Sequence, residues 1–398
     1  MRVALASSLL LAAACTTPSN AAKTTPVDAR PIAKEDAGAM TAPHEGEDLA
    51  ALLEPLRVKY KLPALAGAIV SDEKIEALGV TGFRKDGDRA PALVTDAFHL
   101  GSDTKALTAV VIAKAVEAGK ITWTTTIGQA FVGVPMDPAY ANVTLEDLLA
   151  MRAGFPHDPK GISIRELRAL TGPMRDQRDV YVKKALLDAP DVPPKTKTSY
   201  SNVSYVVAAV MVERATGVAW EDAIRTQVFE PLGMTGAGFG AMGTPGKIDA
   251  PWQHLAKPDG LTPIEPGPNA DNPLAMAPAG CVHVPIAGWA YFLRDQLRGA
   301  AGKGALLKPE TYKYLQSAHS PEGYFAGWQG LDRSWGKGRV FTHTGSNTVS
   351  FALVWMAPGI RRAFLVMTNQ ADPGDATFQA GDAVVSELLK WASSKGEP

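Results

Sequence analysis

The chain has 398 residues, a formal net charge of −1 at pH 7, 46% hydrophobic and 20% charged residues. This length suits one large or two ordinary domains. The balanced charge argues against a nucleic-acid-binding protein that depends on a large basic excess, and two cysteines are too few for a disulfide scaffold. We therefore expect a globular protein without a nucleic-acid partner.

The first residues predict an export signal. Arg2 precedes the apolar or small run 3–14 in "MRVALASSLLLAAAC", which suits a signal peptide and is too short to span a bilayer. We expect residues 1–14 to be removed. The stretch resembles a bacterial lipoprotein signal, which implies lipidation of Cys15 and a location in the cell envelope or periplasm. Simple secretion, with cleavage after Ala21, is the alternative.

The next segment predicts a flexible tether. Residues 16–45 contain four prolines and no aromatic residue, so they cannot bury enough apolar surface to offset the entropy of ordering. We expect residues 15–45 to form the tether and the folded domain to span residues 46–395.

Sheet patterns lie at both ends of this domain. After an amphipathic helix in "DLAALLEPLRVKY", the runs "LAGAIV" and "IEALGVTGFR" predict an antiparallel hairpin. Near the end, "RVFTHTG", "VSFALVWMA" and "RRAFLVMTNQ" are β-rich and are followed by a last helix in "DAVVSELLKWAS". The intervening chain is rich in helical patterns, several of which end in glycine.

These patterns predict an α/β protein of the α+β kind. One antiparallel sheet is built from residues 46–100 and 320–395 and is flanked by the terminal helices. An all-helical part, residues 101–319, is inserted into it. The cleft between the two parts is the expected site.

The pattern Ser-x-x-Lys, which can pair a nucleophile with a base, occurs three times. The pairs are Ser71 with Lys74, Ser102 with Lys105, and Ser334 with Lys337. Only Ser102 opens a long predicted helix, where residues i and i+3 share a face and the N-terminus favours developing negative charge. The alternative is that Ser102 is an N-cap and the lysine is exposed.

Two further patterns could supply a base or bind a substrate. Tyr-x-Asn occurs at Tyr140 and at Tyr200, and a tyrosine beside an amine can act as a base. Either tyrosine could instead be packed beside a capping asparagine. The run His343-Thr344-Gly345 lies on a predicted strand, where glycine would let a substrate approach the backbone.

In this order, Ser102-x-x-Lys105, Tyr200-x-Asn202 and His343-Thr344-Gly345 resemble the active-site set of the serine β-lactamase and penicillin-binding peptidase family. The resemblance is to the branch of class C β-lactamases and D-alanyl-D-alanine carboxypeptidases, which includes esterases. It extends over residues 47–392 through segments such as "VTLEDLLAMRAGFP", "FEPLGMTGAGFG" and "APAGCVHVPIAGWAYFL". Placement in the "YSN" segment selects Tyr200 over Tyr140.

The resemblance implies a covalent acyl-enzyme on Ser102, with Lys105 and Tyr200 as candidate bases. Lys105 would stabilise a phenolate on Tyr200 and orient the serine, and Asn202 would hold Lys105 and the substrate amide. His343, Thr344 and Gly345 would bind substrate, His343 as a possible proton relay. The backbone N–H groups of Ser102 and Ser346 would form the oxyanion hole.

Two departures from the family pattern bear on the substrate. Residues 151–155 read Met-Arg-Ala-Gly-Phe where the family usually has His-Thr-Ser-Gly-Leu, and His343 stands where β-lactamases usually have lysine. Histidine is mostly uncharged at neutral pH, so it attracts a substrate carboxylate less than lysine does, which disfavours an efficient β-lactamase. We therefore expect a carboxypeptidase-like peptidase or an esterase. A class C-type β-lactamase is the alternative, and a non-catalytic envelope binding protein is a further one.

No cofactor or metal is implied, because the seven histidines form no H-x-H or H-E-x-x-H pattern. The G-x-S-x-G elbow that is typical of α/β-hydrolases is also absent from the sequence, which disfavours that class of enzyme. The expected partner is a small-molecule or peptide substrate, such as one derived from peptidoglycan. Specificity would lie in the loops around 152–195 and 240–278.

Overall fold

The computed structural model describes residues 45–396 apart from residues 318 and 373. The predicted signal peptide, Cys15 and the predicted tether up to residue 44 lie outside the described residues.

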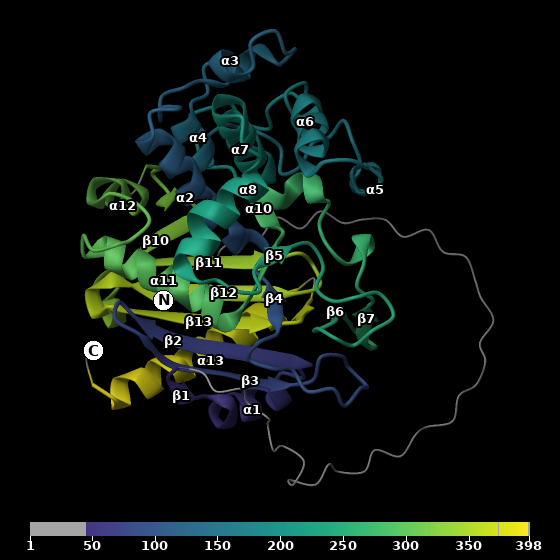
Figure 1. Cartoon of the computed structure of the whole chain (residues 1–398), viewed down its shortest axis with the longest axis vertical. Coiled ribbons are helices and arrows are strands. Elements are labelled where there is room, and N and C mark those ends of the chain that lie inside the picture. Colours follow the sequence, from purple (N-terminus) through teal and green to yellow (C-terminus); the bar gives the residue numbers. More distant parts are fainter. Residues whose placement is uncertain (1–44, 318, 373, 397–398) are drawn as a thin grey trace, which may run out of the picture. The chain divides into compact units, whose positions relative to one another are not determined.

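Strands from both ends of the chain form one eight-stranded sheet (Figure 1). Its strands are β1 (Glu47–Asp48), β2 (Ala64–Ser71), β3 (Ile75–Gly82), β9 (Tyr324–Phe325), β10 (Trp328–Arg333), β11 (Gly338–Ser346), β12 (Phe351–Ala357) and β13 (Arg362–Thr368). Their order is β1-β3-β2-β13-β12-β11-β10-β9. The N-terminal β2 pairs antiparallel with the C-terminal β13, which places Ala68 opposite Leu365. The predicted sheet is thereby confirmed, except that β1 pairs parallel with β3.

Strand β2 shows why helices cover both faces of this sheet. Side chains alternate between faces along a strand, so Ala66 and Ala68 join one apolar cluster while Leu65 and Ile69 join another. The terminal helices α1 (Ala50–Lys59) and α13 (Ala376–Ser394) pack on the face of Leu65. Helix α11 (Ile286–Ala300) packs on the strands from the opposite face. It therefore belongs to the sheet layers, although it lies within the segment predicted to form the inserted part.

Within the described residues, all the other α-helices lie in the inserted part. They are α2 (Thr104–Glu117), α3 (Ile127–Ala130), α4 (Leu145–Leu149), α5 (Ile164–Arg168), α6 (Met174–Ala185), α7 (Asn202–Thr216), α8 (Trp220–Ile224), α9 (Glu230–Leu232), α10 (Ala277–Gly280) and α12 (Pro309–Leu315). Of these, α3, α4, α6 and α7 lie at the top of Figure 1. Helices α2 and α7 are buried almost all round and pack against each other. They form the base on which the candidate site is built.

The prediction that residues 101–319 are all helical is wrong. Strand β8 (Val282–Pro285) lies between β4 (Ala97–His99) and β5 (Gly238–Phe239), and β6 (Gln253–Lys257) lies between β14 (Gln370–Ala371) and β7 (Gly260–Ile264). These strands are too short to show a clear alternation. Strand β7 also contains Pro263, which is tolerated because β7 is an edge strand.

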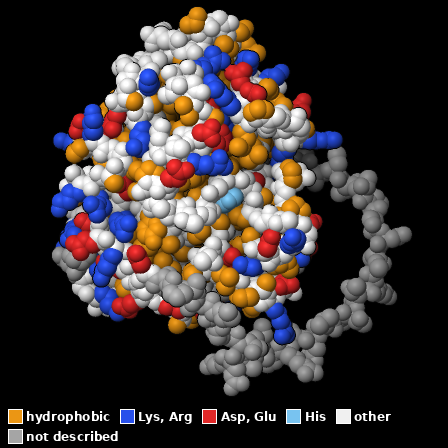
Figure 2. Space-filling view, in the orientation of Figure 1, with side chains coloured by type: hydrophobic (Ala, Val, Ile, Leu, Met, Phe, Trp, Pro, Cys, Tyr) orange, Lys and Arg blue, Asp and Glu red, His pale blue; other side chains and the backbone are white. Residues whose placement is uncertain are grey.

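The surface shown in Figure 2 mixes basic and acidic side chains, in keeping with the net charge of −1. Within residues 45–396, no single helix combines the length and apolar composition needed to cross a membrane. Helix α7 and the segment Trp220–Leu232 meet those criteria only together, and an 87° bend separates them.

Candidate active site

A short turn presents Ser102 at the start of a buried helix. Residues Gly101–Asp103 form a 3-10 turn between β4 and α2. Asp103 and not Ser102 occupies the N-cap of α2, so the capping alternative for Ser102 is wrong. Lys105 lies in the first turn of α2, and its Nζ is 3.0 Å from the Ser102 Oγ.

The Lys105 side chain is fully buried and its amine has three partners. Besides Ser102, they are the Asn202 Oδ1 at 2.9 Å and the Ala279 carbonyl oxygen at 2.7 Å. Burial lowers the pKa of Lys105 to about 7, although the nearby carboxylates of Asp158 and Asp103 partly oppose this shift. The Asn202 and Ala279 oxygens can only accept hydrogen bonds, so they take the two N–H bonds of the neutral amine. Its lone pair is then left for the Ser102 hydroxyl.

Tyr200 and Asn202 enter the site from the start of α7. The Ser201 hydroxyl accepts a hydrogen bond from the Ser204 amide and donates one to the Pro156 carbonyl, so Ser201 and not Asn202 is the capping residue. The centre of the Tyr200 ring lies 4.8 Å from the Lys105 Nζ.

The protonation of Tyr200 differs from the expected phenolate. Its surface is 38% exposed, but packing around its hydroxyl group raises its pKa, and a hydrogen bond with Ser102 only partly opposes this. Tyr200 is therefore a phenol near neutral pH. Because the pKa of Lys105 is about 7, the amine is the better proton acceptor of the two.

Both ring nitrogens of His343 have partners other than Ser102. Its Nδ1 lies 3.1 Å from the Asp103 Oδ1 and its Nε2 lies 3.2 Å from the Tyr324 hydroxyl. Burial and the charge of Lys105 lower the pKa of His343 to about 3, and burial raises the pKa of Asp103 well above its ordinary value. The imidazole is therefore neutral and joins the turn before α2 to β11 and β9. These partners do not favour the expected relay to the nucleophile.

Gly345 allows the turn Gly101–Asp103 to pack against β11. This turn carries the candidate nucleophile Ser102 and is called the nucleophile turn. A Cβ on Gly345 would overlap the Leu100 carbonyl oxygen and lie 2.9 Å from the Ser102 amide nitrogen. Gly101, with φ +50°, makes the reciprocal approach, since a Cβ there would overlap the amide nitrogen of Ser346. The structure thus brings the backbones of Ser102 and Ser346 together. The space where a Cβ of Gly345 would stand is thus filled by the backbone before Ser102, and the approach of a substrate to Gly345 stays a prediction.

One edge of β11 is open beside this turn. Strand β12 pairs with β11 as far as Ser346, whereas pairing with β10 ends at Thr342. The side chains of Thr344 and Ser346 are exposed, while His343 is buried. Within the described part of the chain, residues 343–346 therefore offer one unpaired backbone edge and two hydroxyl groups.

A cavity of about 370 Å³ opens over Ser102, Asn202 and Ser346. Its wall includes Asp158 and Arg168 from the predicted specificity loop 152–195. It also includes Met276, near the end of the predicted specificity loop 240–278. The structure therefore brings both loop regions to the serine. Thr344 lies two residues before Ser346 on the same strand.

Asp158 is a site residue that the sequence analysis did not identify. Its carboxylate accepts hydrogen bonds from the Asn202 Nδ2 at 3.1 Å and from the His157 Nδ1 at 2.6 Å. Burial raises its pKa, but the hydrogen bond and charge of His157 outweigh burial, so the net shift is downward. The signal in the sequence, "FPHDP", is an ordinary loop pattern, and only the fold brings it to Asn202.

The other Ser-x-x-Lys and Tyr-x-Asn patterns lie away from this site. The Ser71 hydroxyl bonds to the backbone of Lys74 in the turn between β2 and β3, and Ser334 begins a 3-10 turn before β11. Tyr140 is buried against Phe155, with 4.0 Å between the ring centres. Among the residues described, no group of three or more His, Cys, Asp or Glu side chains is placed to hold a metal ion.

A family model described as Beta-lactamase matches residues 49–387. This chain belongs to the Beta-lactamase family. The resemblance found in its sequence is therefore confirmed, and the chain is a serine hydrolase of this family.

Two relatives show how much of the chain the similarity covers. Penicillin-binding protein 4 of Amycolatopsis lactamdurans is 25% identical over 333 residues, which cover 79% of this chain and 83% of that protein. Unguisins hydrolase ungD' of Aspergillus campestris is 25% identical over 377 residues, which cover 86% of this chain and 64% of that protein.

Solved structures confirm the fold of this family member. A penicillin binding protein from Bacillus halodurans superposes with a TM-score of 0.67 at 19% identity, covering 84% of this chain and 99% of that chain. The D-amino acid amidase from Ochrobactrum anthropi SV3, complexed with L-phenylalanine, superposes with a TM-score of 0.68 at 17% identity, covering 87% and 99%.

Proposed function

We propose that this serine hydrolase is a D-alanyl-D-alanine carboxypeptidase-like peptidase or an esterase that acts through an acyl-enzyme on Ser102. The observation that carries this proposal is the Lys105 amine, which is buried, has a pKa of about 7 and lies 3.0 Å from the Ser102 hydroxyl. A serine hydroxyl is a weak nucleophile until an adjacent base accepts its proton.

The proposed reaction has two halves. In acylation, Lys105 takes the Ser102 proton while the Oγ attacks the carbonyl carbon, and the resulting oxyanion accepts hydrogen bonds from the Ser102 and Ser346 amides. The C–N or C–O bond then breaks, and the leaving group takes the proton held by Lys105. In deacylation, water loses a proton to the same amine and attacks the ester, which releases the acid and restores the Ser102 hydroxyl.

The environment of His343 supports a peptidase or esterase over an efficient β-lactamase. With a pKa of about 3, His343 supplies no fixed positive charge for a substrate carboxylate at neutral pH. The free edge of β11 can pair with an extended peptide backbone. The similar proteins named penicillin-binding protein, D-amino acid amidase and D-stereospecific amidohydrolase agree with a peptide or amide substrate.

The position of Arg168 suits both the peptidase and the alternative of a class C-type β-lactamase. The Arg168 guanidinium lines the cavity and is anchored through Nε and Nη2 to the Asp271 carbonyl oxygen. A guanidinium held in this way can attract the carboxylate of a β-lactam, and equally that of a peptide C-terminus.

Intact-mass spectrometry tests the proposal. The purified protein and a Ser102→Ala variant are incubated separately with a penicillin, an activated ester and a D-alanyl-D-alanine peptide. We expect one acyl adduct per chain on the unmodified protein, none on the variant, slow release of the penicilloyl group, and turnover of ester or peptide. Rapid penicillin turnover would instead identify a β-lactamase. No adduct and no turnover by a folded protein would leave the non-catalytic binding protein.

The N-terminal sequence supports a proposed location in the cell envelope. We propose that Cys15 is lipidated after removal of residues 1–14 and that this anchor tethers the hydrolase to a membrane near peptidoglycan-derived substrates. Metabolic labelling with an alkyne fatty acid tests it, with Cys15→Ser as the control. Labelling that persists in the variant, or a protein secreted without lipid, would contradict the anchor.

A further inference from the structure

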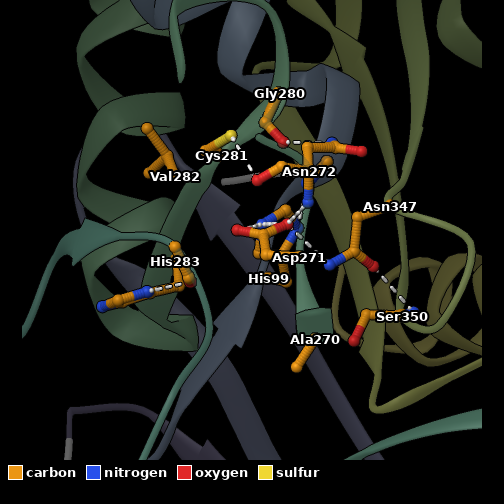
Figure 3. A network of polar contacts seen from close by, with 12 residues as sticks. His99, Ala270, Asp271, Asn272, Gly280, Cys281, Val282, His283, Asn347 and Ser350 are labelled. Carbon is orange, nitrogen blue, oxygen red and sulfur yellow. Dashed lines mark hydrogen bonds and ion pairs between the residues drawn. The ribbon is translucent and has the colours of Figure 1, made fainter. Parts of the chain in front are cut away.

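The Asp271 carboxylate lies at the centre of a buried polar network beside the nucleophile turn (Figure 3). Only 3% of its surface is exposed. It lies 2.9 Å from the His99 Nε2 and accepts hydrogen bonds from the Asn347 Nδ2 at 2.9 Å and the Asn272 amide at 2.6 Å. Asp271 therefore joins segments that are far apart in the sequence.

The first connection leads to Ser102. The Gly101 amide donates a hydrogen bond to the His99 Nδ1 at 2.9 Å. Because that nitrogen accepts, the imidazole proton is on Nε2 and is donated to Asp271. Asp271 thus selects the tautomer of His99 that can hold the backbone directly before Ser102.

The second connection leads to Ser346. Asn347 follows Ser346, and its Nδ2 donates to Asp271 and to the Gln253 Oε1. Its Oδ1 accepts a hydrogen bond from the Ser350 amide at 3.0 Å. The turn after β11 is therefore held by the same carboxylate as the turn that carries the nucleophile.

We propose that Asp271 is the positioning residue of the oxyanion hole, and this inference rests on the acyl-transfer function proposed above. Asp271 sets the separation of the Ser102 and Ser346 amides through His99 on one side and Asn347 on the other. Such donors stabilise the oxyanion only when they are held within about 0.5 Å of the productive geometry. Asp271 touches neither the substrate nor the reacting atoms.

An amide cannot replace this carboxylate. The ionised group accepts from both His99 and Asn347, whereas the Asn side chain in Asp271→Asn has one oxygen and one NH₂ group. In one orientation the NH₂ group takes the place of Oδ1 and faces the Asn347 and Asn272 donors. In the other it takes the place of Oδ2, so the His99 Nε2 keeps only the oxygen that it must share with those two donors. The variant therefore loosens one of the two connections while keeping nearly the same volume.

The test compares a matched ester and thionoester, whose acylation rates are measured separately on the full chain. A thiono sulfur is a longer and weaker acceptor, so the ratio of oxo to thiono rates reports how tightly the oxyanion hole is held. For Asp271→Asn we expect kcat on the ester to fall about 10²-fold with KM changed by less than about threefold, and the ratio of rates to fall. Asn347→Ala removes one connection only and should lower the ratio in the same direction.

The matched control is Asp295→Asn in α11. Asp295 is also buried and accepts hydrogen bonds from the Ala305 amide and the Tyr312 hydroxyl, away from the cavity. This variant should lose stability but keep the ratio of rates. An unchanged ratio in both Asp271→Asn and Asn347→Ala, with the unmodified protein active, would overturn the positioning role alone. If the unmodified protein forms no acyl-enzyme, the proposed function fails as well.

Discussion

The Lys105 Nζ lies 3.0 Å from the Ser102 Oγ, and both remaining partners of this amine are acceptor oxygens. The neutral amine fits these partners with its lone pair toward the serine, whereas the ammonium form has a third N–H directed at the hydroxyl. The charge state of Lys105 therefore decides whether Ser102 can be activated.

We expect kcat/KM for an ester to rise with pH by about tenfold per unit below the pKa of Lys105 and to level off above it. Since burial lowers this pKa to about 7, the change of slope should lie near neutral pH. The pH dependence of kcat/KM at constant ionic strength measures it. A flat profile between pH 5 and pH 9, with the protein folded throughout, would contradict Lys105 as the base.

Asp158→Asn should move this change of slope to lower pH by up to about one unit. The Asp158 carboxylate is the largest charge that raises the pKa of Lys105, so its removal makes the ammonium form less favourable. Asp191→Asn is the control, because Asp191 is an exposed loop residue paired with Lys160. Equal shifts in the two variants would show that Asp158 acts only through the net charge of the region.

Gly345→Ala should reduce both stability and acylation. The added methyl group would overlap the Leu100 carbonyl oxygen, so β11 and the nucleophile turn must separate. Such overpacking costs about 1–3 kcal/mol, and the same movement separates the Ser102 and Ser346 amides. Thermal unfolding and kcat measure the two effects. Gly161→Ala, where the nearest atom would lie 3.7 Å away, should change neither.

His343→Gln should make the protein more resistant to acid. The folded pKa of His343 is about 3, below its ordinary value of 6.5, so between these values the unfolded chain binds a proton that the folded chain excludes. Stability is therefore lost as pH falls from about 6.5 toward 3, at a rate on the order of 1 kcal/mol per pH unit. The variant removes this loss.

Urea unfolding at pH 7 and pH 4.5 compares the two proteins. His157→Gln is the control, since the His157 side chain is 62% exposed. If His343→Gln loses as much stability between the two pH values as the unmodified protein, burial of a neutral His343 is not what limits acid stability.

The sequence alone determined the features that depend on short spacings. Ser102 and Lys105 are three residues apart at the start of a helix, so their contact follows from helix geometry once that helix is recognised. Short β-rich runs bounded by turn residues identified β2, β3, β11, β12 and β13, and their positions at both chain ends indicated one shared sheet. The short strands of the inserted part were missed, because two to five residues interrupted by proline show no clear period.

Only the tertiary structure decided the roles that depend on distant contacts. Lys105 meets Asn202 across 97 residues, His343 meets Asp103 across 240, and Asn347 meets Asp271 across 76. No local pattern encodes these distances, because they arise when α2, α7 and the main sheet pack together. The same packing removes water from Lys105 and His343 and so lowers the pKa of each. Residue types thus indicated the chemistry, and burial decided which groups carry charge.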